Sequence, residues 1–343
     1  MPGADKSYNL RPFLLKPAGQ DYLWGGRRLK DDFCKDLPMT PLAETWECST
    51  HPDGESSAFG GAFDGMKLSD VLKSHPEMMG THPASQSPED AAEGHLPILV
   101  KFIDAAADLS VQVHPSDEYA AQYENGQRGK TEMWYVVDAS RDASLIYGFA
   151  RDMERDLLED MLRGRRDGLE ECLLRVPVRK DDVFFIEAGT VHAVGAGSLI
   201  VEVQESSNLT YRMYDYHRVG KDGKERHLHI DKALAVASLK KSTSPRQPMR
   251  VLRYRQGYAS EFLCRCRYFE VERVLLNTER MRSMAGMKAS ASSFEVLVCT
   301  RGCGAVIGED YCIPFCQGDT FFVPAGSDLF HIHGRAELLR VRC

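Results

Sequence analysis

Short segments in which apolar and polar residues alternate make up most of this chain. They are rich in β-branched and aromatic residues, and glycine, proline, aspartate and asparagine separate them, which is typical of strands joined by turns. The alternation predicts strands over 98–102, 110–114, 132–137, 144–147, 182–186, 198–203 and 209–214. We therefore expect a mainly β protein.

Helical spacing of apolar residues is confined to a few stretches. It predicts helices over 68–74, 117–123, 151–174 and 231–240. Ser116 and Asp231 are the expected N-caps of the second and fourth helices. The third is interrupted at Gly164 and Gly168 and falls between predicted strands, so we expect a helical insertion near 151–174, packed on the outside of the β structure.

A repeat indicates how the strands are organised. Residues 182–190 and 319–327 agree at one aspartate, two phenylalanines, an alanine and a glycine, and a loop and an apolar strand follow each copy. Two copies of one β unit predict two jelly-roll barrels. Leu329 in the second copy occupies the position of His192 in the first, so we expect the second barrel to lack a metal.

A polar stretch with two prolines, 240–248, marks the expected boundary between the barrels. We therefore expect a metal-binding catalytic domain over 1–240, which includes the helical insertion, and a metal-free jelly-roll domain over 241–343. In the second domain, His331 and His333 fit the polar end of a strand better than a ligand pair.

Composition and charge exclude several classes of function. With 43% hydrophobic and 27% charged residues, the chain is typical of soluble globular proteins. Its formal charge of −7 argues against a nucleic-acid-binding surface. No apolar run approaches the roughly 20 residues that cross a bilayer, and residues 1–7 lack the apolar core of a secretion signal. We expect a cytoplasmic protein with no nucleic-acid or membrane partner.

The ten cysteines are scattered along the chain, and neither close pair, Cys264/Cys266 nor Cys299/Cys303, has the spacing of a zinc ribbon. In a reducing compartment we expect them to remain thiols, either buried apolar residues or incidental surface groups.

Residues far apart in the sequence combine metal-binding chemistry with strand positions. Gln112 and His114 are two apart on one predicted strand and therefore point to the same face. Glu132 begins another strand, and His192 follows the first copy of the repeat. Two imidazoles, a carboxylate and a neutral oxygen suit a borderline divalent metal, with zinc as first choice and manganese, iron and cobalt still open. Each residue alone has an ordinary explanation, such as a salt bridge between Glu132 and Lys130, so the prediction depends on their occurring together.

Further polar residues lie on faces of these strands where burial without a partner would be costly, which predicts a ligand cavity at the mouth of the first barrel. Glu202 is a candidate general base, and Arg212 can hold an anionic group or a developing oxyanion. Lys101, Lys130 and Arg218 are possible cationic contacts, although surface salt bridges would explain them equally well.

Several segments resemble the type I mannose-6-phosphate isomerases (phosphomannose isomerases), especially the short bacterial form. They run in order from about residue 10 to 240 and read YLWGGR, ETWECS, LSVQVHPSDEYA, GKTEMWY, AGTVHA, LTYRMYDY and HLHIDKA. The resemblance implies a metal-dependent isomerase of the cupin superfamily that interconverts mannose 6-phosphate and fructose 6-phosphate. Glu187 stands where the family usually has proline, so we expect a looser turn before His192.

The resemblance also implies roles for individual residues. It assigns one Zn²⁺ per chain to Gln112, His114, Glu132 and His192, catalysis to Arg212, a pocket carboxylate to Glu202, and substrate contacts to Ser110 and Lys130. Two alternatives remain open, a non-haem metal cupin oxygenase and a sugar-phosphate-binding cupin without catalysis. The sequence leaves the oligomeric state open.

Overall fold

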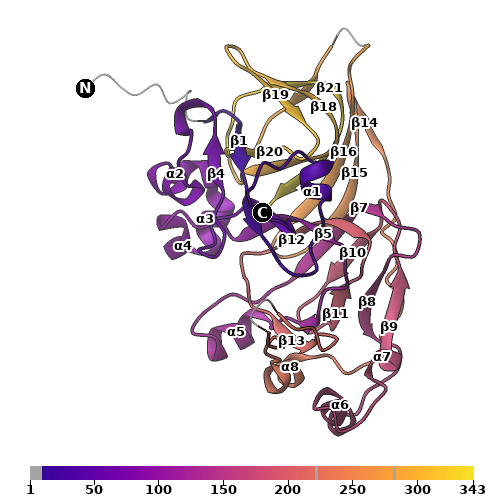
Figure 1. The fold of residues 1–343 in the computed structure, drawn as a ribbon. Helices are drawn as coiled ribbons and strands as arrows, with labels where there is room; N and C mark the ends of the chain where they lie inside the picture. The colour runs from indigo at the N-terminus through magenta and orange to yellow at the C-terminus, as the bar shows by residue number, and fades with distance from the viewer. Residues whose placement is uncertain (1–9, 221–222, 281–282) are drawn as a thin grey trace.

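The computed structural model describes residues 10–220, 223–280 and 283–343, so the N-terminal segment 1–7 discussed above lies outside the described residues. The fold is mainly β, with antiparallel sheets arranged as two cupin-type jelly-roll barrels and with short helices around them (Figure 1). Within the described ranges, no helix is both long and apolar enough to cross a membrane.

Two sheets form the first barrel. The six-stranded sheet has the order β10 (Val183–Ile186), β7 (Glu132–Ala139), β12 (Ser198–Glu205), β5 (Ile98–Ala105), β3 (Glu44–Cys48) and β2 (Ala18–Gln20). The five-stranded sheet has the order β13 (Tyr211–Tyr214), β6 (Val111–Val113), β11 (His192–Val194), β8 (Ser144–Phe149) and β9 (Leu173–Pro177). Ile103 and Trp134 from the first sheet share an apolar cluster with Leu145 and Val194 from the second, which places this part of the core between the sheets.

The third sheet forms the second barrel and draws on both ends of the chain. Its order is β14 (Arg253–Arg255), β15 (Tyr258–Arg265), β16 (Glu270–Asn277), β21 (Phe330–Arg342), β18 (Glu295–Ile307), β20 (Thr320–Val323), β1 (Phe13–Lys16) and β4 (Ser57–Phe59), with β17 (Ala285–Met287) beside β21 and β19 (Cys312–Cys316) beside β18. Because β1 pairs with β20, the N-terminal part of the chain crosses the boundary expected at residue 240.

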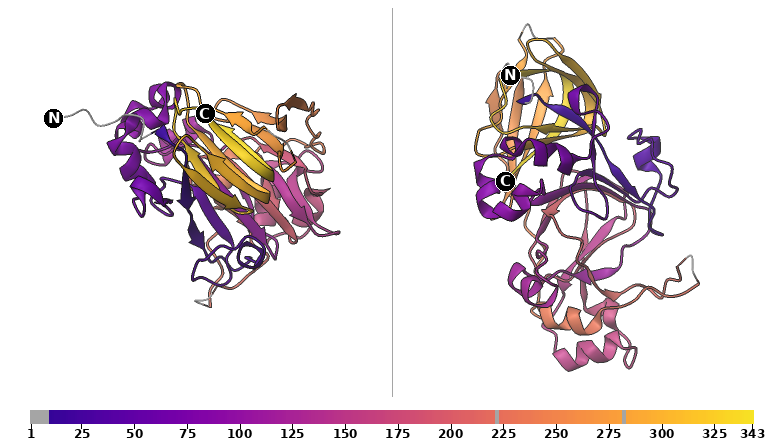
Figure 2. Two further views of the ribbon diagram at one scale, coloured as in Figure 1. Left: turned by 90° about the horizontal axis from the view of Figure 1, so that it is seen from above. Right: turned by 90° about the vertical axis from the view of Figure 1, so that its left-hand side faces the viewer.

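One apolar cluster joins the two barrels. Phe102 and Val201 of the six-stranded sheet belong to the same buried cluster as Val271, Phe322 and Leu339 of the second barrel. A continuous apolar core therefore joins the two lobes seen in Figure 2.

The helices lie at the ends and sides of the sheets. They are α1 (Arg28–Asp31), α2 (Leu68–Ser74), α3 (Thr81–Gln86), α4 (Pro88–Ala92), α5 (Asp117–Tyr123), α6 (Arg155–Leu162), α7 (Leu169–Cys172) and α8 (Ile230–Val236), with the 3₁₀ turns η2 (Gly61–Phe63) and η3 (Pro76–Met79). Helices α2 and α5 have the predicted bounds, and Ser116 Oγ accepts the backbone N–H of Tyr119 at 3.4 Å as the expected N-cap.

Two helix predictions need correction. His229 is the N-cap of α8, and Asp231 lies in its first turn, where its carboxylate pairs with Arg163, the C-cap residue of α6, instead of capping. The insertion near 151–174 is divided into α6 and α7, since Gly164 and Gly168 adopt positive φ angles of 68° and 97°. Figure 1 shows α6 and α8 at the end of the first barrel, outside its sheets.

Candidate metal centre and adjoining cavity

The five-stranded sheet aligns several of the predicted site residues. Strand β6 lies between β11 and β13, so that Gln112 is directly opposite His192 on one side and Arg212 on the other. Val111 and Val113 are fully buried in an apolar cluster on the other face, as the alternation predicts. Glu132 reaches the same region from the start of β7 in the facing sheet.

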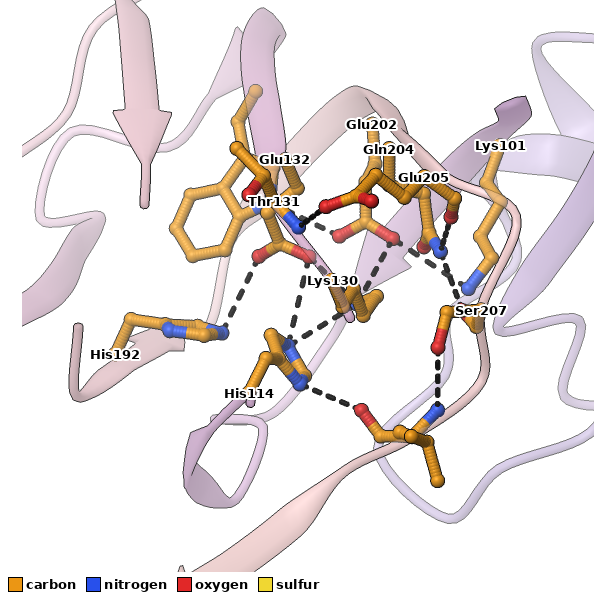
Figure 3. A network of polar contacts seen from close by, with 12 residues as sticks. Lys101, His114, Lys130, Thr131, Glu132, His192, Glu202, Gln204, Glu205 and Ser207 are labelled. Atoms are coloured by element: carbon orange, nitrogen blue, oxygen red, sulfur yellow. Dashed lines mark hydrogen bonds and ion pairs between the residues drawn. The ribbon is translucent and has the colours of Figure 1, made fainter. Parts of the chain in front are cut away.

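His114, Glu132 and His192 converge in the closed interior. One ligand atom from each lies within 4.8 Å of the other two. Oε2 of Glu132 is 3.6 Å from Nε2 of His114, and Oε1 is 3.3 Å from Nε2 of His192 (Figure 3). All three side chains are at most 1% exposed. Three residues predicted from separate strands thus form one buried cluster.

Backbone carbonyls orient both imidazoles. Nδ1 of His114 lies 2.8 Å from the carbonyl oxygen of Leu209, and Nδ1 of His192 lies 2.8 Å from that of Thr190. Since a carbonyl oxygen only accepts, each Nδ1 must carry the proton, which leaves the Nε2 lone pair free for a metal.

The turn before His192 is closed without the proline. The N–H of Thr190 donates to the carbonyl of Glu187 at 3.0 Å, and the N–H of Gly189 donates to the carbonyl of His114 at 2.8 Å. Gly189 adopts a φ of 87°, which favours glycine. Backbone hydrogen bonds therefore tie the turn that carries one candidate ligand to the residue that provides another.

The donor set fits a divalent metal. Oε1 of Glu132 and Nε2 of His192 are buried, and neither has a hydrogen-bond partner among the described residues, a costly arrangement unless another group satisfies them. Burial lowers the pKa of His192 to about 4, and burial together with Lys130 holds the pKa of His114 well below its usual range. Both imidazoles are therefore neutral at pH 7, the form that binds metal.

The carboxylate of Glu132 responds to the same burial in the opposite direction. Burial, followed by the charge of Glu202, raises its pKa to about 7. Lys130 opposes this, since its Nζ lies 2.6 Å from Oε2 of Glu132 and 3.2 Å from Nε2 of His114. The salt bridge considered as an ordinary explanation for Glu132 is thus present, but it is part of the ligand cluster.

A cavity of about 270 Å³ adjoins the cluster. Five residues singled out from the sequence as substrate, catalytic or ligand groups line it: Ser110, Gln112, Lys130, Glu202 and Arg212. Lys101 lines it as well, whereas Arg218 lies elsewhere and pairs with Asp215.

Glu202 is the buried carboxylate of the cavity wall. Its Oε2 accepts the indole N–H of Trp134 at 3.0 Å, and its Oε1 lies 3.5 Å from Nζ of Lys101 and 3.7 Å from Nζ of Lys130. Burial alone would raise the pKa of Glu202, but the two ammonium groups outweigh burial and hold it below its usual value. The group is therefore an ionised proton acceptor near neutral pH.

Another part of the cavity wall is basic, and hydrogen bonds hold its arginines. Nε of Arg212 donates to Ser110 Oγ at 3.3 Å, and its Nη1 donates to the carbonyl of His227 at 3.0 Å. Arg226 also lines the cavity and is held by Asp215. Two guanidinium groups near an ionised carboxylate suit an anionic, hydroxyl-rich ligand.

Sequence reasoning missed some of the wall. Arg226 lies between predicted elements, in a stretch without periodicity, and no signal pointed to it. Glu44 and Tyr22 carried a weak signal, because both lie in segments that resemble the isomerases.

Comparisons with known proteins agree with this geometry. Residues 13–140 match the model of the phosphomannose isomerase type I catalytic domain, and residues 259–343 match that of the mannose-6-phosphate isomerase cupin domain. Mannose-6-phosphate isomerase ManA of Bacillus subtilis is 35% identical over 331 residues, which cover 96% of this chain and 98% of that protein. The chain belongs to the type I phosphomannose isomerase family.

Solved structures of isomerases have the same fold. The crystal structure of the mannose 6-phosphate isomerase from Bacillus subtilis has a TM-score of 0.86 at 30% identity and covers 96% of this chain and 99% of that one. A structure of a mannose 6-phosphate isomerase bound with zinc and yttrium has a TM-score of 0.71 at 16% identity and covers 96% and 98%. At that identity, the second comparison concerns the fold alone.

Proposed function

We propose that this chain is a zinc-dependent aldose–ketose isomerase that interconverts D-mannose 6-phosphate and D-fructose 6-phosphate. Membership of the isomerase family supports the substrate and the reaction. The observation that carries the proposal is the convergence of three ligand atoms within 4.8 Å, linked through Lys130 to a cavity lined by an ionised carboxylate and two arginines.

His114, Glu132 and His192 would hold the metal, with Gln112 as a fourth, weaker ligand. Neutral imidazoles and a carboxylate suit zinc, and three strong ligands leave room for oxygen atoms of the sugar. Gln112 lines the cavity and is paired with His192 on the neighbouring strand, which supports its assignment as a fourth ligand. A bound zinc would polarise the carbonyl and hydroxyl oxygens of the sugar.

Glu202 would move the proton. The reaction removes a proton from carbon 2 of the aldose and returns it to carbon 1 through an enediolate, so no co-reactant is consumed. An ionised carboxylate in the cavity wall is suited to accept and return that proton. Lys101 and Lys130, each within 4 Å of this carboxylate, keep it charged before the reaction.

Arg212, Ser110 and Lys130 would bind the substrate. The guanidinium of Arg212 lines the cavity and is oriented by two hydrogen bonds, so it is placed to oppose negative charge on the enediolate or the phosphate. Ser110 and Lys130 would provide further polar contacts to the sugar phosphate.

The direct test is turnover of mannose 6-phosphate, measured by coupling fructose 6-phosphate formation to a reporter enzyme. We expect turnover by the zinc-loaded protein, its loss after treatment with a chelator, and its return when zinc is restored. A folded, zinc-loaded protein without turnover would contradict the proposal. Activity that returned with ferrous iron but not with zinc would contradict the assigned metal.

Three further assignments are part of the proposal. We propose a metal-binding catalytic domain over 1–240, with its helical insertion near 151–174, and a second, metal-free barrel over 241–343. The positions of the two matched family models support this division of the sequence, which strands β1 and β4 cross to join the sheet of the second barrel. We also propose a cytoplasmic protein whose partner is a phosphorylated hexose, and the acidic composition argues against a nucleic-acid or membrane-surface partner.

A further inference from the structure

Two exposed cysteines face each other on neighbouring strands of the second barrel. Strands β18 and β19 form an antiparallel hairpin, and their register places Cys303 directly opposite Cys316. Both thiols are free and both residues are exposed. Figure 1 shows this hairpin at the outer end of the second barrel, well separated from β7, β11 and the end of β6, where the candidate metal ligands lie.

The register makes this a close pair. Opposite residues in antiparallel strands alternate between hydrogen-bonded and non-hydrogen-bonded pairs. Pro314 lacks an N–H, so its pair with Ala305 is non-hydrogen-bonded, and the pair two residues along, Cys303 and Cys316, has the same character. The Cα atoms of such pairs lie about 4.5 Å apart, within the range of about 4.4–6.8 Å that a disulfide spans.

The backbone of Cys316 supports this conclusion. Its N–H donates to Oδ2 of Asp319 at 2.7 Å, and its carbonyl accepts the N–H of Asp319 at 3.0 Å. Both polar groups are therefore occupied by the turn into β20 rather than by β18. The turn is itself held in place, because Lys35 Nζ donates a hydrogen bond to the carbonyl oxygen of Gly318 at 2.5 Å.

The two side chains share the outer face of the hairpin. Val306 is an odd number of residues from Cys303, and Phe315 is next to Cys316. Both are buried in the apolar cluster of the second barrel. Because side chains alternate across a strand, Cys303 and Cys316 point to the other, exposed face. Peroxide in solution therefore has access to both sulfur atoms without unfolding of the barrel.

We infer that Cys303 and Cys316 are a redox modification site, a dithiol that hydrogen peroxide converts into a cross-strand disulfide. One thiolate attacks peroxide, so that an S–O bond forms, the O–O bond breaks and hydroxide leaves. The second thiolate then attacks the resulting sulfenic acid, so that an S–S bond forms and the S–O bond breaks. In total, two thiols and one hydrogen peroxide yield one disulfide and two waters.

The turn into β20 affects one of the two thiols. Burial and the neighbouring carboxylate of Asp319 raise the pKa of the Cys316 thiol. Since the thiolate is the attacking species, Cys316 attacks more slowly than an ordinary thiol in either step of the reaction.

A third thiol, Cys34, provides the main competing outcome. The loop after α1 lies against the same turn, since Gln317 Nε2 donates to the carbonyl of Asp32 at 3.4 Å. Cys34 is exposed and close enough to contribute to the raised pKa of Cys316. A Cys34–Cys316 link would connect the two barrels, but strand pairing does not align these residues as it aligns Cys303 with Cys316.

The test is peroxide treatment of the zinc-loaded full chain, followed by blocking of the remaining thiols and mass spectrometry without reduction. Trypsin leaves both cysteines in one peptide because residues 302–334 contain no lysine or arginine, whereas cleavage after Glu309 separates them. We expect the two glutamyl fragments to remain linked, the peptide to lose two hydrogen atoms, and a reducing agent to restore both thiols.

Serine variants identify the pair. Cys303→Ser and Cys316→Ser should each reduce the linked species to background, whereas Cys312→Ser should leave it unchanged. Cys312 is a matched control, because it is exposed on the same face of β19 but lies opposite Ile307. All three variants should retain turnover, which reports correct folding.

Two results would overturn the assignment. One is a link that persists in Cys303→Ser, as expected if Cys34 were the partner. The other is peroxide oxidation of both residues to sulfinic acid with no link between them. Neither outcome bears on the proposed isomerase activity, which is measured separately on the reduced protein.

Discussion

Two of the three candidate ligands are neutral for the same reason. His114 and His192 are buried, and burial lowers the pKa of each imidazole, while a carbonyl oxygen holds each Nδ1–H. Glu132 would be costly as an isolated buried charge, yet Lys130 lies 2.6 Å away. The residues therefore provide a donor set with one paired charge, which a divalent cation completes.

Removal of one ligand should release the metal without unfolding the protein. We expect His192→Ala to weaken zinc binding by at least about 10-fold, since loss of even an indirect partner of a ligand costs about 10–100-fold. Zinc per chain after dialysis, measured by elemental analysis, checks this. His331→Ala in the second barrel should leave the zinc content unchanged. Equal losses in the two variants would argue against the proposed ligand set.

Arg212 should be needed for turnover but not for the metal. We expect Arg212→Ala to lower kcat by about 100-fold or more, the usual cost of removing a donor that faces developing negative charge. Zinc content should be unchanged, because the guanidinium contacts Ser110 and the His227 carbonyl rather than the ligand cluster. Arg163→Ala, at the exposed C-cap residue of α6, serves as a control for loss of an arginine. Near-normal turnover without Arg212 would remove it from the mechanism.

Some site residues were predictable because alternation and chemistry coincide. Gln112 and His114 belong to a segment whose other face, Val111 and Val113, is purely apolar, so their inward placement followed from the period of the strand. Arg226 could not be found in this way. It reaches the cavity from an irregular segment through its ion pair with Asp215, a tertiary contact that leaves no periodic trace in the sequence.

At the scale of elements, local signals predicted bounds well where no tertiary contact competed. Helix α5 begins after Ser116, whose side chain caps it, and α2 has the bounds that its apolar spacing indicates. The start of α8 was predicted wrongly because Asp231, a good N-cap by type, pairs with Arg163, the residue that follows α6. Such competition between helices is not visible in a single segment.

The turn between β10 and β11 should be sensitive to a single methyl group. A Cβ at Gly189 would combine a φ of +87° with a 3.0 Å approach to the carbonyl oxygen of Val236. We expect Gly189→Ala to lower the free energy of unfolding by about 2–3 kcal/mol and to weaken zinc binding, because the turn positions His192. Denaturant unfolding and zinc titration measure the two effects.

Gly164→Ala is the matched control for this substitution. Gly164 also has a positive φ, +68°, but no atom of the described residues lies within 4 Å of a Cβ placed there. It should lose only about 1 kcal/mol, the cost of the backbone conformation alone, with no change in zinc affinity. Equal losses at the two sites would mean that the crowding beside Val236 is relieved at no cost.

At the scale of the whole molecule, the N-terminal strands were not predictable as part of the second barrel. The repeat at 182–190 and 319–327 correctly indicated two β units, which contain β10 and β20. Strand β1 nevertheless pairs with β20 across about 300 residues of sequence. No strand was predicted for these four residues, and so short a segment carries no information about which sheet it joins.

A second contact between the barrels brings two carboxyl groups together, and one of them is buried. Tyr268, in the turn between β15 and β16, donates to Oδ2 of Asp117 at 2.8 Å. Glu205, at the end of β12, accepts the N–H of Thr131 at 2.7 Å and is 1% exposed. Burial, and then the charge of Asp117, raise the pKa of Glu205 to about 8.

This raised pKa predicts a loss of stability as pH rises. The folded protein holds a proton on Glu205 that the unfolded chain releases near its ordinary pKa of 4.5, so folding binds protons between pH 4.5 and about 8. The associated stability is fully present below pH 4.5 and is lost progressively as pH rises to about 8, by a few kcal/mol in order of magnitude.

Glu205→Gln keeps a neutral acceptor for Thr131 and should abolish this component. Denaturant unfolding at saturating zinc should therefore show that the variant gains stability over the wild type as pH increases from 5 to 8. The exposed control Glu309→Gln should show no such trend. If the difference in stability between Glu205→Gln and wild type did not change with pH, Glu205 would already be ionised in the folded protein.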